Sequence, residues 1–190
     1  MNRTLAALMM TVAALSAAPA LAQTAKGPTA IVSPQPLPID DSRPRVFLGG
    51  SIDMGGAPDW QAAMTSALAD MDVVILNPRR PDWSPNWRPE ADEPEFRRQV
   101  EWELAALESA DVIVMYFAPG TQSPISLLEM GLHARGGKLI VLAPQGFWRK
   151  GNVDITAQAY GVKQVQSLPE LTAAVREALS AAAARGRFAR

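Results

Sequence analysis

Glu129 is a carboxylate in a stretch of sequence that otherwise looks buried. It is the one acid between Ser123 and Ala134. On a 3.6-residue period the apolar residues of this stretch go nearly all the way round, so we expect a largely buried helix; they are Ile125, Leu127, Leu128, Met130, Leu132 and Ala134. A desolvated, unpartnered carboxylate is costly, so Glu129 must be paired, hydrogen-bonded or used in chemistry.

The sequence before Glu129 predicts a strand, a short loop and a helix start. Residues 112–117 form a continuous apolar run, residues 118–122 interrupt it, and Ser123-Pro124 has the types preferred at an N-cap and first helical position. The helix N-terminus, about two turns away, favours the ionised form of Glu129. An ionised carboxylate at a strand's end is a candidate nucleophile. The alternative is a structural glutamate that caps a loop or pairs with an arginine.

Glu103 is the second acid that is hard to explain as solvated surface. The spacing predicts an amphipathic helix over 94–109, with Phe96, Val100, Leu104 and Leu107 on one face. At about 100° per residue, Glu103 falls roughly 60° from the centre of that face, and Glu101 falls well outside it. A salt bridge to a neighbouring arginine is the alternative to a functional role for Glu103.

Alternating strands and helices must position these two acids. We expect strands at 45–49, 72–76, 112–117, 138–142 and 162–166, with helices at 58–69, 94–109, from 123 onward, 152–160 and 168–184. This order predicts an α/β fold, a doubly wound sheet of about five parallel strands with helices on both faces. Three loops, 50–56, 77–94 and 118–123, then meet at the carboxyl edge of the sheet, where ligands bind.

Two of these loops carry further candidate binding residues. Gly50, Ser51, Ile52 and Asp53 belong to a glycine-rich loop that can approach a ligand closely, although a plain tight turn has a similar sequence. The loop lacks the dinucleotide and P-loop spacings. In the long 77–94 loop, Trp83 can stack on a planar ring or anchor its own loop.

The two ends of the chain differ in composition from the folded domain between them. Arg3, an apolar run over 5–18 and a small-residue site at 20–22 predict a signal peptide at 1–22, cleaved after Ala22. We therefore expect a periplasmic or secreted protein with no membrane span after cleavage. The proline-rich segment 23–44 predicts an extended tether or a surface-packed arm, the folded domain covers 45–184, and 185–190 is a basic tail.

Composition removes several classes of function. The chain has no cysteine, which excludes disulfides, thiolate metal sites and a cysteine nucleophile. His133, the single histidine, has no partner at a metal-ligand spacing, and nothing in the sequence indicates a metal or an organic cofactor. The formal net charge of −1 gives no electrostatic case for binding a nucleic acid polymer.

Several short motifs together resemble the nucleoside 2-deoxyribosyltransferase-like family. They are LGGSI at 48–52, LNPRR at 76–80, EWEL at 101–104, ADVIV at 110–114, SPISLLEMG at 123–131 and GFWRKGNVD at 146–154. The resemblance covers about 45–171. It implies a flavodoxin-like fold and an enzyme, a transferase or hydrolase, that acts on the N-glycosidic bond of (deoxy)nucleosides, with no cofactor.

The resemblance assigns the two glutamates to catalysis. The family's nucleophilic glutamate falls on Glu129, and an acid that assists in the site falls on Glu103. Glu129 would attack the anomeric carbon to give a covalent glycosyl-enzyme while an acidic group protonates the leaving base. Glu103 would orient the sugar and Glu129 or share the proton transfer, and the sequence leaves both roles open.

Three positions depart from the family's patterns, two from the transferases and one from a nucleotide-hydrolysing branch. Ser123 replaces an aspartate that handles the base in transferases; a nucleotide-hydrolysing branch has serine there and uses it to bind phosphate. That branch has an arginine at the position of Asp53, whose carboxylate would repel phosphate. Phe47 replaces a tyrosine. The implied substrate-binding residues are Phe47, Gly50, Ser51, Ile52, Asp53, Trp83, Ser123, Asn152 and Asp154.

The resemblance also implies a homodimer or higher homo-oligomer in which a late segment of one subunit completes a neighbour's site. Asn152 and Asp154 are the candidates, with helix N-capping as their alternative role. Two other functions remain open. One is hydrolysis of nucleoside, nucleotide or NAD-type N-glycosides, and the other is a non-catalytic module on the same fold that binds a ligand or partner.

Overall fold

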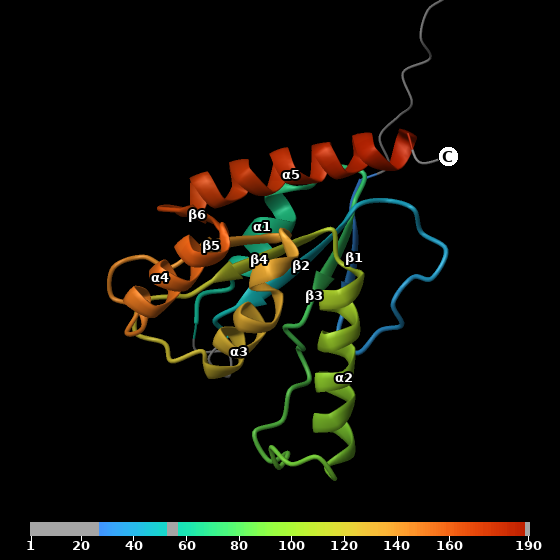
Figure 1. The fold of residues 1–190 in the computed structure, drawn as a ribbon. Coiled ribbons are helices and arrows are strands. Elements are labelled where there is room, and N and C mark those ends of the chain that lie inside the picture. The colour runs from blue at the N-terminus through green and yellow to red at the C-terminus, as the bar shows by residue number, and fades with distance from the viewer. Residues whose placement is uncertain (1–26, 53–56, 189–190) are drawn as a thin grey trace, which may run out of the picture.

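The computed structural model describes residues 27–52 and 57–188 (Figure 1). The predicted signal peptide and Asp53 lie outside these residues. Among the helices described, none combines the length and the hydropathy that a membrane span requires.

The described strands form one parallel sheet of six. They are β1 (Thr29–Val32), β2 (Arg45–Gly50), β3 (Val74–Asn77), β4 (Val112–Tyr116), β5 (Leu139–Leu142) and β6 (Lys163–Val165). Their spatial order is β1-β3-β2-β4-β5-β6, and every neighbouring pair is parallel. From β3 to β6 this is the flavodoxin-like strand order. The predicted fold class is therefore confirmed, with one strand more than expected.

The additional strand comes from the proline-rich segment 23–44. Thr29 to Val32 pair in register with Val74 to Asn77 of β3. Three of these four residues have β-branched side chains suited to an edge strand, and Pro34 follows two residues later, where it can donate no ladder hydrogen bond. Residues 27–44 thus form a packed arm rather than a free tether, and the sheet begins before Arg45.

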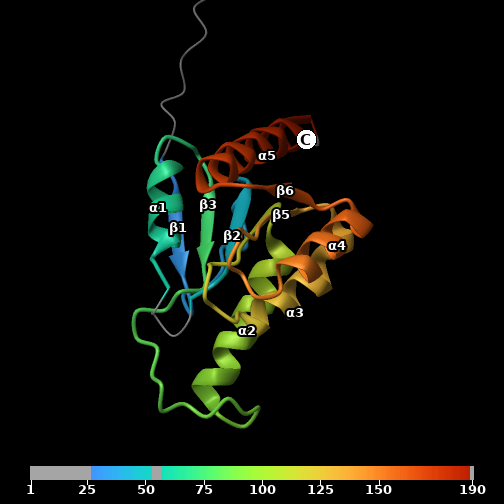
Figure 2. The same cartoon turned by 90° about the vertical axis from the view of Figure 1, so that its left-hand side faces the viewer.

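Helices cover both faces of the sheet. They are α1 (Trp60–Ala67), α2 (Pro94–Ser109), α3 (Pro124–His133), the short 3₁₀ helix η2 (Ala134–Gly136), α4 (Lys150–Tyr160) and α5 (Leu168–Phe188). Apolar residues of α1 and α5 share one core with the sheet, and residues of α2, α3 and α4 share the other (Figures 1 and 2). α5 ends at Phe188, so its last turn includes part of the segment predicted as a basic tail.

The central strand β4 supplies both cores. Val112, Val114 and Tyr116 face the α1 and α5 side, whereas Ile113 and Met115 face the other. This alternation explains why the run is apolar at every position. Full burial of each such side chain contributes about 1.5–3 kcal/mol to stability, so β4 holds the loop that follows it on a rigid base.

The structure corrects the expectation that α3 is buried on all sides. Ile125, Leu128 and Leu132 are 58%, 60% and 60% exposed. Only one side of α3 packs on the sheet, and no described element covers the other. Apolar composition alone does not distinguish a helix inside a core from a helix with an uncovered apolar face.

Candidate active site

The site lies where the order of the strands reverses. β2 and β4 are neighbours in the sheet, although β3 separates them in the sequence. From β2 the chain moves to β3 on one side of β2, and from β3 it crosses to β4 on the other side. The loops after β2 and β4 therefore diverge and open around a crevice. Ser51 follows β2, and residues 118–123 follow β4, as expected from the sequence.

Gly50 brings these two strand ends into close contact. Its φ is +128°, and a Cβ there would lie 2.3 Å from the carbonyl oxygen of Tyr116. The backbone N–H of Ser51 donates to the same oxygen at 2.8 Å. Glycine at this position therefore permits the close approach of β2 to β4, which is a structural reason that needs no ligand. Ile52, the last described residue before the gap, is partly exposed.

Three hydroxyl groups meet at the start of α3, and we call Ser51, Thr121 and Ser123 the hydroxyl cluster. The Oγ of Ser51 lies 2.7 Å from Thr121 Oγ1 and 2.6 Å from Ser123 Oγ. The backbone N–H of Ala118 also donates to Ser51 Oγ at 2.8 Å. The cluster holds together both sides of the crevice.

Ser123 is the N-cap residue of α3, as predicted, but its side chain makes no capping hydrogen bond. Its φ and ψ are 46° and 51°, the left-handed region, and its hydroxyl turns toward Ser51 instead. The first N–H groups of α3 are left without a side-chain cap, and such groups together with hydroxyls favour anions.

Glu129 is buried in the second turn of α3, with 7% of its surface exposed. Burial, and secondly the nearby charge of Glu103, together raise its pKa to about 8. The sequence had led us to expect the helix N-terminus to favour the ionised form. The structure reverses that expectation, because desolvation and a second carboxylate outweigh a dipole whose effect fades after the first turn.

Glu103 faces this site from α2. Burial of its carboxyl raises its pKa to about 7, while a hydrogen bond from the Gln99 side chain, 2.8 Å from Nε2 to Oε1, lowers it. Glu101 is exposed and pairs with Arg97 at 3.1 Å. The structure therefore brings Glu103, and not Glu101, to Glu129.

The buried face of α2 differs in detail from the predicted one. Leu104 is 46% exposed, and the buried residues are Gln99, Trp102, Ala106 and Leu107. Glu103 lies about 45° from the centre of this observed face at about 100° per residue. The indole N–H of Trp102 donates to the carbonyl of Gln35 at 2.7 Å, so part of the face packs against the N-terminal arm.

Two interacting carboxyl groups with raised pKa values can hold one proton between them near neutral pH. In that state one group is an anion and the other an acid, because two like charges in a desolvated site cannot both ionise easily. A carboxylate nucleophile beside a carboxylic acid is the combination that cleaves glycosidic bonds with retention of configuration.

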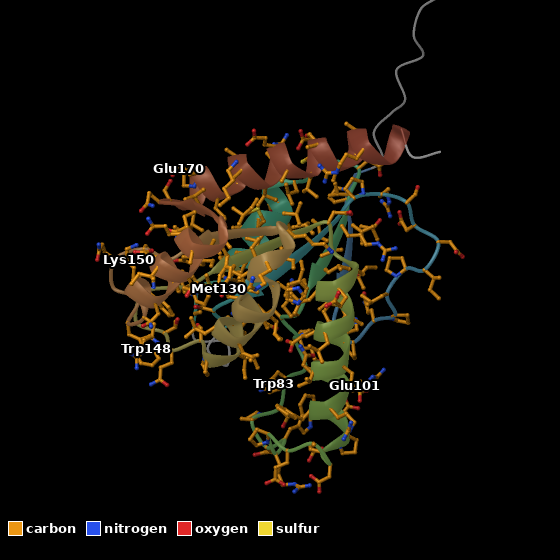
Figure 3. The ribbon with its side chains drawn as sticks, in the orientation of Figure 1. Trp83, Glu101, Met130, Trp148, Lys150 and Glu170 are labelled. Carbon is orange, nitrogen blue, oxygen red and sulfur yellow. The ribbon has the colours of Figure 1, made fainter. Side chains whose placement is uncertain are left out.

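Trp83 packs within its own loop. Its ring lies edge-on to Trp87, with centroids 5.2 Å apart, and the guanidinium of Arg80 lies 4.7 Å from the Trp87 ring. Arg80 also pairs with Asp82 and Glu95, at 2.9 and 3.1 Å. These contacts support the loop-anchoring interpretation of Trp83, which lies beyond the end of α3 in the view of Figure 3.

Asn152 and Asp154 lie on α4 and are not N-caps, because the helix begins at Lys150. Asp154 pairs with Lys150 at 2.8 Å. Asn152 lines a cleft of about 320 Å³ between α3 and α4, together with Met130 and Gly131. Those two residues lie about 100° and 200° round α3 from Glu129, so the cleft opens on another side of the helix. Within one chain, these residues do not reach the glutamate pair.

Phe47 is fully buried in the core on the α2 side. Two polar residues that the sequence analysis missed are buried close to the predicted ones, Gln99 beside Glu103 and Thr121 beside Ser51. Gln99 precedes Glu103 by one helical turn, and that spacing is a signal that the sequence contains.

Comparison with known proteins gives a family and a fold. The family model described as nucleoside 2-deoxyribosyltransferase like matches residues 43–147. A conserved protein of known crystal structure from Enterococcus faecalis V583 is similar in fold, with a TM-score of 0.52 and 12% identity over 71% of this chain and 98% of that one. No curated protein matches the sequence.

Proposed function

The chain belongs to the nucleoside 2-deoxyribosyltransferase-like family, and we propose that it is an enzyme that cleaves N-glycosidic bonds of (deoxy)nucleosides through a covalent intermediate on Glu129. The observation that carries this proposal is the pair of carboxyl groups. Glu129 and Glu103 come from different helices, are both desolvated, and interact electrostatically at the crevice.

In the first step the ionised Glu129 attacks the anomeric carbon. The bond from this carbon to the base breaks, its electron pair goes to the base nitrogen, and the proton of Glu103 is transferred to the departing base. The products are a glycosyl ester on Glu129, a free base and an ionised Glu103. In the second step Glu103 takes a proton from an acceptor base or water, which attacks the ester and releases Glu129 as the carboxylate.

This cycle requires one proton on the pair. Below the lower pKa both groups are neutral and there is no nucleophile; above the higher pKa both are ionised and there is no acid. The profile of kcat/KM is therefore expected to be a bell with its maximum between about pH 7 and about pH 8.

The test is a substrate panel with matched glutamate variants. Purified residues 23–190 are incubated with deoxynucleosides, ribonucleosides, their monophosphates and NAD, with and without a free acceptor base, and chromatography follows base release and exchange. We expect Glu129→Gln to lose at least about 10³-fold in kcat, and Glu101→Gln to retain activity. A wild type and a Glu129→Gln variant that behave alike on every substrate would support the binding-module alternative.

A nucleoside monophosphate is the second candidate substrate, and the hydroxyl cluster favours it. Three hydroxyls beside uncapped N–H groups at a helix start suit a phosphate group. If the monophosphate is the substrate, Ser123→Ala should lower kcat/KM for monophosphates by about tenfold and leave nucleosides nearly unchanged. Equal losses on both substrate classes would favour nucleosides.

The uncovered side of α3 supports a homodimer. Ile125, Leu128 and Leu132 form an exposed apolar stripe at i, i+3 and i+7, and Glu129 lies about 40° from Ile125 on the same helix. A second copy seated on this stripe would exclude water at the edge of the site. It would also bring residues of the other subunit to the site, which is the role expected for Asn152 and Asp154.

We also propose that the protein is exported to the periplasm or the medium. This part of the proposal rests on the predicted signal peptide at residues 1–22. The mature protein is expected to begin at Gln23. Mass spectrometry of the protein recovered from a secreting host would detect this N-terminus, whereas a cell-retained chain beginning at Met1 would contradict export.

A further inference from the structure

A chain of hydrogen bonds joins the N-terminal arm to the glutamate pair. Ser33, which follows β1 and is 2% exposed, lies with its Oγ 2.5 Å from Oε1 of Gln99 on α2. Gln99 is 4% exposed, and its Nε2 donates to the carbonyl of Pro78 at 2.9 Å and to Oε1 of Glu103 at 2.8 Å. Three separate segments therefore converge on one buried side-chain amide.

The partners of Gln99 permit only one orientation of its amide. The carbonyl of Pro78 accepts hydrogen bonds and cannot donate, so the Nε2 end must face it. Oε1 then faces Ser33, whose hydroxyl can donate. The reversed amide would place oxygen against oxygen at Pro78 and lose a buried bond. Both N–H groups of Gln99 are thus committed, one to Pro78 and one to Glu103.

We propose that Gln99 is a positioning residue, fixed by Ser33 and by the carbonyl of Pro78, that donates to Oε1 of Glu103 and so confines any proton on Glu103 to Oε2. The proposal rests on the proposed function for its catalytic meaning. Oε2 is then the one oxygen from which Glu103 can give its proton to a leaving base. The bond also favours negative charge on Glu103 over Glu129 in the resting pair, in line with the lower pKa of Glu103. The form that reacts, with the proton on Glu103 and the charge on Glu129, is therefore the less populated of the two one-proton forms.

The other charged groups near this bond have partners elsewhere. In the loop after β3, Arg79 lies 3.4 Å from Oε1 of Gln61, and Arg80 pairs with Asp82 and Glu95. The arm contributes no charge between Ser33 and Pro38. Among the described residues, Glu129 on α3 is the charged group whose pKa responds to Glu103. Gln99 is the neutral donor that links the arm to the two glutamates.

The test measures the titration of Glu103 directly in the substrate-free protein. Carboxyl-¹³C glutamate labelling and NMR follow both side chains against pH, with assignments from Glu103→Gln and Glu129→Gln. Gln99→Met removes the donor at similar volume, and the pKa of Glu103 is expected to rise by about one unit. Gln61→Met, which removes another buried amide that does not bond to Glu103, is the matched control and should leave the titration unchanged.

Ser33→Ala is the second variant, expected to give a smaller shift in the same direction because it releases only one end of Gln99. An unshifted Glu103 in folded Gln99→Met would overturn the proposal. If that variant does not fold, an unshifted Glu103 in Ser33→Ala would do the same. A merely structural role for Gln99 would lower the melting temperature of Gln99→Met without moving the titration of Glu103.

The activity readout separates this inference from the proposed function. Where a substrate is turned over, the acid limb of the kcat/KM bell should move to higher pH in Gln99→Met, since the first proton loss from the pair, which comes from Glu103, becomes harder. If the Glu103 titration moves in Gln99→Met but the protein turns over no substrate, Gln99 still positions Glu103 and the proposed catalytic function is contradicted. Turnover with an unmoved bell would remove the positioning role alone.

Discussion

Glu129 makes the free energy of unfolding depend on pH in a direction opposite to that of most surface acids. Its folded-state pKa of about 8 lies above the ordinary value of 4.5 for a glutamate side chain. The group therefore gives its full contribution below about pH 4.5, and this contribution is lost as the pH rises toward 8. The protein tolerates a desolvated carboxyl at its centre because that carboxyl can keep its proton.

We predict that Glu129→Gln stabilises the protein at alkaline pH, because the amide has nothing to ionise. The gain over wild type should be small at pH 5, grow as the pH rises and reach about 5 kcal/mol above pH 8, at about 1.4 kcal/mol for each unit by which the pKa is raised. Urea unfolding at pH 5 and pH 8.5 measures it. Glu101→Gln, on the exposed side of α2, is the control and should differ from wild type equally at both pH values. A gain that is the same at both pH values would show that Glu129 is not buried as described.

At the scale of single residues, the sequence identified the two glutamates but not the residues that hold them in place. Apolar surroundings selected Glu129, and a helical wheel separated Glu103 from Glu101. Gln99 was detectable in principle at i−4 from Glu103. Ser33 was not, because 66 residues separate it from Gln99 and only the folded sheet brings them together.

Among the elements, α3 carries both the proposed nucleophile and an exposed apolar stripe. We predict that wild type sediments as a dimer and that Leu128→Lys raises the dimer dissociation constant by at least about 100-fold, because a lysine charge would be buried at the contact. Ile39→Lys, at a residue that is 91% exposed on the arm, is the matched control. Analytical ultracentrifugation over a range of concentrations decides, and a wild type that is monomeric at all of them would contradict the dimer.

The elements were predictable where their patterns were strong. Helix α2 has the predicted bounds, and β4 ends one residue early, because a proline start and a continuous apolar run are local signals. β1 was missed because four residues within a proline-rich segment carry too little pattern. The uncovered side of α3 was missed because composition does not reveal which neighbours a helix has.

At the scale of the whole molecule, the strand order turns these elements into one site. The reversal between β2 and β4 places the hydroxyl cluster between them, and Glu129 in the second turn of α3 lies close enough to Glu103 of α2 for their charges to interact. The arm adds an edge strand and reaches the pair through Gln99. The same six-stranded architecture would serve a binding module equally well, so the distinction between enzyme and module rests on chemistry at Glu129.

The most direct measurement of that chemistry is the intact mass of the protein quenched during turnover of a 2-fluoro-2-deoxy nucleoside, a substrate class that slows release of the glycosyl-enzyme. The account predicts a mass increase of one fluorinated sugar, located by peptide mapping on Glu129 and absent from Glu129→Gln. Base release without any adduct, or an adduct that maps to another residue or persists in Glu129→Gln, would contradict it.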